Sequence, residues 1–387
     1  METNKNNTIC LNMIVKNESK IIKRCLESVY DIIDTWCIID TGSTDGTQEI
    51  IKEFLKDKPG ILHEKKWVNF GHNRDEALKL GSSWGDWLIT TDADMVLVNT
   101  GFTKDQLSLD IDVYDLMQDN NGTCYNNMRI LNTKKVWNCL GVTHEYYDCE
   151  GGVNSRVFLN TLHFNDISDG GSKDNKFTRD IALLTQGLID NPENCRYMFY
   201  LAQSYRDTND WENAIKWYQA RWDFGGWEEE QWFALYMVGY CMLKRKDPEK
   251  DSFDNIAAVM FKAWNARPWR SEPIWSLAIE ARMQEKWHNA YQYSKIAATT
   301  SWPKHDVLFI NKAAYGLSAL DEFGISSYYV GEFKESEQAL LKLLNTPGLP
   351  ENEVPRLQKN LWYARKNLGL YDENGLLNYI EQKRKEI

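Results

Sequence analysis

Two aspartates one residue apart, Asp92 and Asp94, follow a short apolar run at residues 87–91. Residues of the same parity along a strand face the same way, so both carboxylates could emerge together where such a strand ends. Hard oxygen ligands suit a divalent cation, which often bridges to the phosphates of a substrate. A strand followed by a solvated acidic turn would give the same spacing. The pattern therefore suggests a cation site but needs a fold that places the two acids together.

Apolar segments alternate with segments of helical periodicity in the first part of the chain. Strands are expected at residues 10–15, 36–40, 61–65 and 87–91, and helices at about 21–33, 47–56 and 70–80. This alternation predicts right-handed βαβ units and a parallel sheet.

Three polar turns follow predicted strands, at residues 16–18, 40–43 and 92–94. In an open α/β sheet, ligands bind outside the carboxyl ends of the strands. A glycine-bearing turn that opens a helix also offers free N–H groups to an anion. The turns predict a nucleotide-sized pocket, but neither GxGxxG nor GxxxxGK[ST] occurs, which argues against a dinucleotide cofactor and a P-loop.

Four segments carry a specific resemblance: residues 11–18 (LNMIVKNE), 38–47 (IIDTGSTDGT), 69–77 (NFGHNRDEA) and 86–94 (DWLITTDAD). In order and spacing they resemble family 2 glycosyltransferases with the GT-A fold, most strongly over residues 9–95 and more faintly to about residue 190. Thr41 departs from the pattern, since many members carry a second acid there. Relatives with threonine at this position often carry helical repeats downstream.

The resemblance implies inverting transfer of a sugar from a nucleotide-diphosphate sugar, with a UDP-sugar as the expected donor and Mn²⁺ or Mg²⁺ as the cofactor. The donor-binding positions that it implies are Lys16, Asn17, Glu18, Asp40, Gly42, Arg74, Asp92, Ala93 and Asp94. Asp94, with Asp92, would hold the cation against the diphosphate, where it stabilises the charge of the leaving group. Glu18 and Asp40 would contact the base or ribose. Arg74 would approach the diphosphate or the base, although a surface arginine on a helix is the plainer interpretation.

On the acceptor side, the resemblance points to His144 and Glu145, after the turn at Gly141. An inverting transferase needs one base to take a proton from the acceptor, and Glu145 is the candidate. Otherwise this carboxylate would pair with Arg129 or Lys134. His144 could instead contact the acceptor or a donor phosphate.

A third metal ligand is expected at His163, because GT-A enzymes often complete the metal shell with a histidine near the end of the domain. A neutral imidazole suits Mn²⁺ better than Mg²⁺. A lone histidine can also be purely structural.

The second half of the chain contains an internal repeat. Small and aromatic residues recur at successive intervals of 3, 9 and 4 residues, as in Ala202, Tyr205, Ala214 and Tyr218. The same steps begin again at Ala278 and at Gly324. Such spacing is typical of tetratricopeptide-like helix pairs. About four degenerate repeats and a terminal cap, at residues 355–366 and 375–385, are expected.

Composition is compatible with this plan. The 387 residues suggest two domains, predicted here as a GT-A glycosyltransferase domain at 1–172 and a helical repeat domain at 173–387. A net charge of -11 argues against non-specific nucleic-acid binding. Eight scattered cysteines without a CxxC pair indicate reduced thiols, and no secretory signal or membrane-length apolar run is expected, so the predicted location is cytoplasmic.

The sequence thus predicts an enzyme that is α/β and then all-α, a metal-dependent inverting hexosyltransferase. Its acceptor would be a glycan or protein hydroxyl or similar nucleophile, and its repeats would dock the acceptor or form a homodimer. Two alternatives are a catalytically decayed GT-A scaffold that binds proteins through its repeats, and a nucleotidyltransferase.

Overall fold

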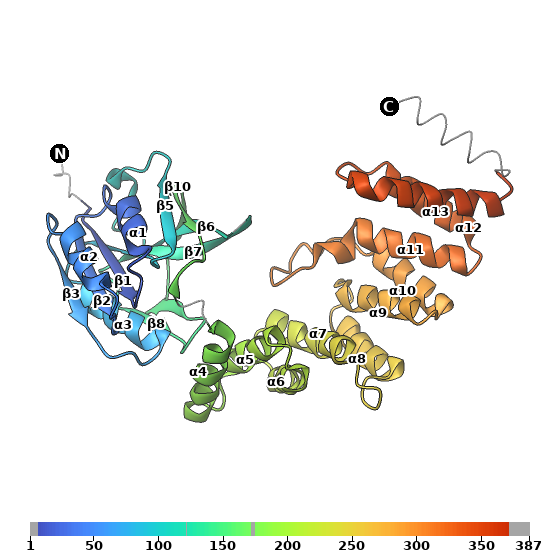
Figure 1. The fold of residues 1–387 in the computed structure, drawn as a ribbon, viewed down its shortest axis with the longest axis horizontal. Helices are drawn as coiled ribbons and strands as arrows, with labels where there is room; N and C mark the ends of the chain where they lie inside the picture. The colour runs from blue at the N-terminus through green and yellow to red at the C-terminus, as the bar shows by residue number, and fades with distance from the viewer. Residues whose placement is uncertain (1–6, 121, 172–174, 371–387) are drawn as a thin grey trace. The chain divides into compact units, whose positions relative to one another are not determined.

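The chain divides into two compact units, Met1–Pro192 and Glu193–Ile387. A computed structural model describes residues 7–120, 122–171 and 175–370 (Figure 1). The boundary between the units follows helix α4 (Lys176–Asp190), whereas the sequence placed it before this helix, between residues 172 and 173. Helix α4 therefore belongs with the sheet of the first unit.

The first unit begins with alternating strands and helices. Its elements are β1 (Ile9–Val15), α1 (Ile22–Val29), β2 (Thr35–Asp40), α2 (Thr47–Phe54), β3 (Gly60–Glu64), α3 (Phe70–Gly81), β4 (Trp87–Thr90), β5 (Met95–Asn99), β6 (Val113–Asn120), β7 (Thr123–Asn132), β8 (Trp137–Leu140), β9 (Tyr146–Cys149), β10 (Arg156–Asp166) and α4. The expected strands and helices up to β4 are confirmed, with ends that differ by a few residues.

Eight of these strands form one sheet in the order β3-β2-β1-β4-β7-β6-β10-β5. Strands β3, β2, β1 and β4 are mutually parallel, as the alternation predicts. Strand β7 is antiparallel to β4, and β5 is antiparallel to β10, so the complete sheet is mixed. Strands β8 and β9 form a separate antiparallel ribbon.

The sheet is covered on both faces in its parallel half. Leu11 and Met13 of β1 pack in one core with residues of α1 and α2. Cys10 and Leu88 face the other way and pack in a second core with Leu78 of α3. Burial on both faces explains why the sequences of these strands are continuous apolar runs. It also leaves their carboxyl ends as the place where polar side chains can reach solvent.

The second unit is entirely helical in its described part, apart from connecting loops. Its α-helices are α5 (Cys195–Asp207), α6 (Trp211–Phe224), α7 (Glu228–Arg245), α8 (Phe253–Ala266), α9 (Glu272–Met283), α10 (Trp287–Thr299), α11 (Leu317–Tyr329), α12 (Phe333–Leu344) and α13 (Val354–Asn367). Each packs against the next helix along the chain.

The predicted repeat positions lie between paired helices. Ala202 of α5 and Ala214 of α6 are completely buried, as are Ala278 of α9 and Ala290 of α10. Small side chains at these positions let helices approach closely. The first segment of the expected cap is α13, while residues 375–385 lie outside the described residues.

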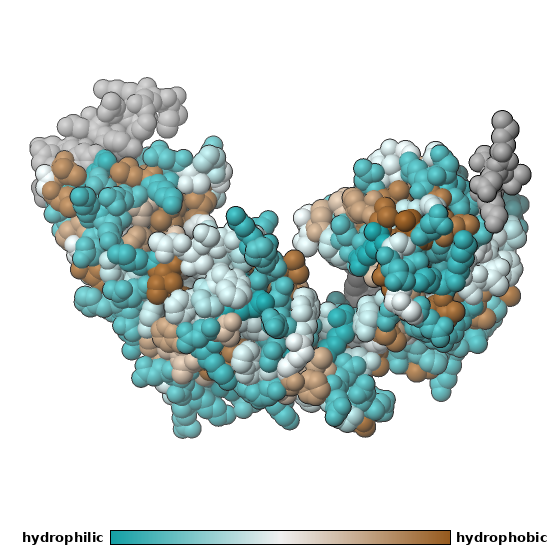
Figure 2. Space-filling view, turned by 180° about the vertical axis from the view of Figure 1, so that it is seen from behind, coloured by the Kyte–Doolittle hydropathy of each residue, from teal (hydrophilic) through white to brown (hydrophobic). Residues whose placement is uncertain are grey.

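The face shown in Figure 2 is mainly hydrophilic, with hydrophobic residues in scattered patches. Among the helices of the described residues, none has the length and apolarity needed to cross a membrane.

Candidate active site

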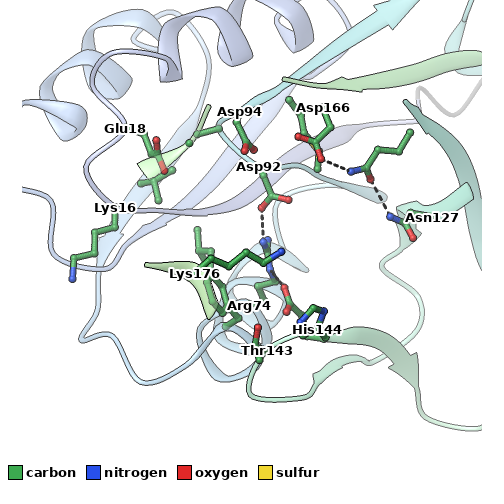
Figure 3. A pocket seen from close by; sticks show the side chains of 18 of the residues that line it. Lys16, Glu18, Arg74, Asp92, Asp94, Asn127, Thr143, His144, Asp166 and Lys176 are labelled. Carbon is green, nitrogen blue, oxygen red and sulfur yellow. Dashed lines mark hydrogen bonds and ion pairs between the residues drawn. The ribbon is translucent and has the colours of Figure 1, made fainter. Parts of the chain in front are cut away.

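A pocket of about 790 Å³ opens at the carboxyl ends of β1 and β4 in the first unit. Its other walls come from α3, β6, β7, β9 with the turn before it, both ends of β10 and the start of α4. Figure 3 shows Asp92, Asp94 and Asp166 along one side, with Arg74 and His144 across from them. Segments far apart in the sequence thus meet at the edge where the sequence predicted a nucleotide-sized pocket.

Asp92 and Asp94 lie in the turn that follows β4, and both line the pocket together with Ala93. The Asp92 carboxylate is paired with the guanidinium of Arg74, and its second oxygen lies 4.0 Å from Nη1 of Arg129. Asp94 is 6% exposed. A Cβ on Gly170 would come within 3.0 Å of Asp94 Oδ2, so the backbone after β10 passes close to this carboxylate.

This donor set fits a hard divalent cation that shares its ligands with a substrate. Among the described residues, no group of three or more His, Cys, Asp or Glu is arranged to hold a metal ion. Mg²⁺ typically takes one or two carboxylates and completes its shell with substrate phosphates and water. Asp92 and Asp94 could supply those carboxylates, which would make cation and diphosphate binding interdependent.

Glu18 connects the turn after β1 to the loop after β10. Both of its carboxylate oxygens accept from the backbone N–H of Gly171, at 3.2 and 3.1 Å. Burial raises the pKa of Glu18 above its ordinary value, and the nearby charge of Asp94 acts in the same direction. The same loop is held by Arg24, which forms two hydrogen bonds with Asp169 at 2.9 and 2.6 Å. Glu18 is therefore at the pocket, as predicted, and carries a structural contact as well.

Two other predicted donor-site residues line the pocket at this turn, Lys16 and Asn17. Asn17 has a φ of 56°, in the left-handed region that asparagine tolerates better than most residues. Its side-chain oxygen accepts from the N–H of Thr44 at 2.8 Å. This bond ties the turn after β1 to the turn after β2.

Asp40 and Gly42, two predicted donor-binding residues, are not among the residues that line the pocket. Oδ1 of Asp40 accepts from the N–H groups of Gly42 and Ser43, both at 2.8 Å, and the side chain is 1% exposed. Asp40 therefore shapes the turn, and Thr41 lines the pocket in its place.

Arg74 is held at the pocket by the packing of α3. Asn69 caps this helix by accepting from the N–H of His72. A Cβ on Gly71 would come within 2.1 Å of the carbonyl oxygen of Gly141, so only glycine allows the helix to press against this turn. The close approach brings Arg74 within reach of Glu145.

Glu145 lines the pocket, and its partner is Arg74 rather than Arg129 or Lys134. Nε of Arg74 donates to Oε1 of Glu145 at 2.7 Å. Burial alone would lower the pKa of Arg74, but the carboxylates of Asp92 and Glu145 raise it well above its ordinary value. Arg74 is consequently a permanent cation between the predicted donor and acceptor sides of the pocket.

His144 also lines the pocket, and it lies near an acid that the sequence did not indicate. Nε2 of His144 lies 3.7 Å from Oδ2 of Asp180, a buried residue of α4. The other oxygen of Asp180 accepts from Arg179 at 3.1 Å and from Thr143 at 3.3 Å. No motif marks Asp180, which is 36 positions beyond His144 and comes near it only through the packing of α4.

His163, the predicted third metal ligand, is not among the residues that line the pocket. It lies within β10, paired with Val98 of β5 and Met117 of β6. Phe164 and Asp166 have the opposite parity and face the other way. Asp166, at the end of β10, lines the pocket, as does Arg156 at the start of the strand, and Gln118 donates to Asp166 at 3.1 Å.

Residues 10–103 match the model of glycosyl transferase family 2. The chain is 29% identical over 224 residues to the SPbeta prophage-derived glycosyltransferase SunS of Bacillus subtilis (strain 168), and equally to glycosyltransferase SunS of Bacillus phage SPbeta. Each alignment covers 54% of this chain and 51% of the relative. The chain thus spans about half the length of these curated relatives. A TPR repeat-containing protein of Synechococcus elongatus is 34% identical over 102 residues, or 26% of this chain and 24% of that protein.

Among solved structures, the C-terminal part of a TPR repeat-containing protein from Cytophaga hutchinsonii is 12% identical, with a TM-score of 0.39, and the match covers 51% of this chain and 68% of that one. BtubC from P. vanneervenii is 13% identical, with a TM-score of 0.37, over 52% of this chain and 86% of that one. The tetratricopeptide-like character of the second unit rests instead on the packing of each helix against the next one. The first unit therefore contains a glycosyltransferase family 2 match at residues 10–103, and helix pairs with tetratricopeptide-like spacing follow in the second unit.

Proposed function

We propose that this chain is a metal-dependent inverting glycosyltransferase that moves a sugar from a nucleotide-diphosphate sugar to a nucleophilic acceptor. The observation that carries the proposal is that Asp92, paired with Arg74, and Asp94 line one pocket next to the segment that matches family 2. The name of the SunS relatives supports the same class of reaction.

Mn²⁺ or Mg²⁺, bound to Asp94 and Asp92, would neutralise the charge that develops on the leaving diphosphate. Arg74 supplies a fixed positive charge next to the same place and needs no reorganisation when the bond breaks. Glu18 and Lys16, which line the pocket just after β1, would contact the nucleoside part of the donor. A UDP-sugar remains the donor that the resemblance favours.

In inverting transfer, the acceptor attacks the anomeric carbon from the face opposite the diphosphate. The acceptor X–H bond breaks as the bond from X to the anomeric carbon forms. The bond from that carbon to the diphosphate oxygen breaks, and its electron pair leaves with the nucleoside diphosphate. The proton passes to a base, for which His144 and Glu145 are the candidates at the pocket wall. The helix pairs of the second unit would dock the acceptor or a second copy of the chain.

A donor-hydrolysis screen tests this function. The full chain is incubated with a panel of UDP- and GDP-hexoses, with Mn²⁺ or with EDTA, and released nucleotide is measured. We expect Mn²⁺-dependent hydrolysis of at least one donor, and a loss of at least ~100-fold in Asp94→Ala. Asp57→Ala, at an exposed position after α2, is the matched control and should keep wild-type activity. Wild-type turnover in Asp94→Ala would contradict the proposed metal site.

A further inference from the structure

The pocket wall formed by β6, β7 and β10 carries a chain of hydrogen bonds that has no part in the proposed reaction. Nε2 of Gln118 donates to Asp166 at 3.1 Å. Oε1 of Gln118 accepts from Arg129 at 2.7 Å and from Asn127 at 3.0 Å. All four side chains line the pocket, and Figure 3 shows the bonds that lead from Asp166 to Asn127. Three of them are buried, whereas Asn127 is partly exposed, so the chain ends at a side chain that a ligand can reach.

The charges at the buried end of this chain fix the orientation of both amide groups. The guanidinium of Arg129 has only N–H donors, so the oxygen of Gln118 must face it. A carboxylate has only acceptors, so the nitrogen of Gln118 must face Asp166. The oxygen of Gln118 also faces Asn127, which must therefore turn its own nitrogen toward Gln118. The orientation of the Asn127 amide thus follows from two buried charges.

The Asn127 side chain keeps one acceptor and one donor for a ligand. Within the described residues, Gln118 is the hydrogen-bond partner of its amide nitrogen, and its oxygen accepts no hydrogen bond. An amide has two N–H groups and a carbonyl oxygen, so one N–H and the oxygen are unused. A hydroxyl both donates and accepts, and it suits this pair of groups. A phosphate has only acceptors and would be repelled by the oxygen, so Asn127 fits a sugar hydroxyl better than a phosphate.

The order of strands places Asn127 beyond the diphosphate as seen from the nucleoside. In the sheet, β1 is followed by β4 and then by β7 and β6. The pairing of β7 with β4 ends at Ile130 and Ile89, so the first part of β7 runs past the end of β4, where Asp92 follows. Nη1 of Arg129 lies 4.0 Å from Oδ2 of Asp92. Asn127 is on the same face of β7 as Arg129, about 7 Å further along the strand. A donor with its nucleoside at β1 and its diphosphate at Asp92 would extend its sugar toward this side chain.

We propose that Asn127 determines donor specificity by hydrogen-bonding a hydroxyl of the donor hexose, and that Gln118 positions it. This inference rests on the proposed function and adds a requirement on the sugar. The hexose must carry a free hydroxyl on the part of its ring that faces β7. The buried charges of Arg129 and Asp166 keep Gln118 in place, so the amide of Asn127 is oriented before the donor binds. A donor that lacks this hydroxyl leaves the amide oxygen without its partner and binds less tightly.

Calorimetric titrations of the full chain with Mn²⁺ test this assignment. The probes are the UDP- or GDP-hexose that the wild-type chain hydrolyses fastest, the matching nucleoside diphosphate without sugar, and versions of that donor in which fluorine replaces one hydroxyl at a time. Fluorine cannot donate a hydrogen bond and is close to a hydroxyl in size. The variants are Asn127→Ala and the control Asn126→Ala. Asn126 is the preceding residue of β7, is exposed, faces the other side of the sheet and does not line the pocket.

We expect Asn127→Ala to bind the nucleoside diphosphate as the wild-type chain does, which also shows that the variant is folded. It should bind the hexose donor ~3- to 10-fold more weakly, as expected for the loss of one hydrogen bond. In the wild-type chain, at least one fluorinated donor should show a loss of the same size. In Asn127→Ala, that fluorinated donor and its parent should bind equally. Asn126→Ala should match the wild-type chain with every probe.

Wild-type affinity for the hexose donor in Asn127→Ala would overturn the proposal. So would an equal loss of affinity for the nucleoside diphosphate and for the hexose donor, because the change would then act on the whole pocket and not on the sugar. An Asn127→Ala chain that still discriminates against the same fluorinated donor would also overturn it. A wild-type chain that neither binds nor hydrolyses any of the nucleotide-hexoses with Mn²⁺ would instead contradict the proposed function itself.

Discussion

Arg74 and Glu145 are joined by a 2.7 Å hydrogen bond between Nε and Oε1 that links α3 to the turn before β9. The same guanidinium pairs with Asp92, the first acid of the Asp-x-Asp motif. One arginine thus ties the two sides of the pocket together before any substrate is present. Both carboxylates are only partly exposed, so the pairing should be stronger than that of surface ions.

A double-mutant cycle measures this pairing. Arg74→Met, Glu145→Gln and the double variant should show a coupling free energy of about 1–3 kcal/mol in urea unfolding of the full chain, because each single change leaves a charged or polar partner unpaired. The exposed pair Lys23 and Glu27, 3.7 Å apart, is the control cycle and should show no measurable coupling. An equal coupling free energy in the two cycles would mean that the ion pair between Arg74 and Glu145 is no stronger than an exposed surface pair.

Gly71→Ala tests the close packing that positions Arg74. The new Cβ would lie 2.1 Å from the carbonyl oxygen of Gly141, a backbone atom that cannot move away alone. We expect a loss of about 1–3 kcal/mol in the free energy of unfolding, as for other overpacked sites. The measurement is the urea midpoint of the full chain.

Gly324→Ala is the matched control for Gly71→Ala. This helical glycine of α11 has Leu340 at 3.4 Å as its nearest neighbour, which is ordinary contact. Alanine there should be neutral or stabilise by up to about 1 kcal/mol. If both variants behaved alike, the contact between α3 and the Gly141 turn would not be restrictive.

Glu18 should give the stability of the first unit a specific pH dependence in the absence of metal. Burial raises its pKa in the folded chain above the ordinary 4.5. A raised carboxyl pKa means that the folded state favours the protonated form, so this contribution is fully present below pH 4.5 and is lost as pH rises through the folded pKa. Relative to Glu18→Gln, the wild-type chain should therefore lose stability between acidic and neutral pH.

Thermal unfolding of both chains in EDTA across that pH range measures the difference. Glu27→Gln, on the exposed face of α1, controls for a generic loss of one carboxyl. If the difference in melting temperature between the wild-type chain and Glu18→Gln stayed constant with pH, or shifted in favour of the wild-type chain as pH rises, Glu18 would not be buried as the structure has it.

The sequence was sufficient for the elements whose signals are local. The apolar runs of β1, β2 and β4 and the turns after β1 and β4 predicted the parallel half of the sheet and its pocket edge. Strand β5 begins at Met95, directly after the motif, and was not predicted, because its antiparallel pairing with β10 is a distant contact. The repeat spacing was readable because the small residues between paired helices have a fixed period.

The sequence located pocket residues only where they directly follow the end of the strand that carries them. His163 was predicted as a ligand from its place near the end of the domain, but strand parity turns it away from the side on which Phe164 and Asp166 lie. Asp40 ends its strand as expected, yet its side chain is used by its own turn. Asp180 could not be found at all, because its relation to His144 depends on how α4 packs against the sheet domain.

The central claim is that Asp94 and Asp92 hold a divalent cation that in turn holds the donor's diphosphate. The most direct measurement is calorimetric titration of UDP into the full chain, with Mn²⁺ and with EDTA, for wild type, Asp94→Ala and Gly170→Ala. In Gly170→Ala the added Cβ would lie 3.0 Å from Asp94 Oδ2 and crowd the carboxylate without removing it. We predict UDP binding that requires Mn²⁺ in the wild-type chain, is weakened in Gly170→Ala and is lost in Asp94→Ala. UDP binding of equal strength in EDTA, or unchanged in Asp94→Ala, would contradict the account.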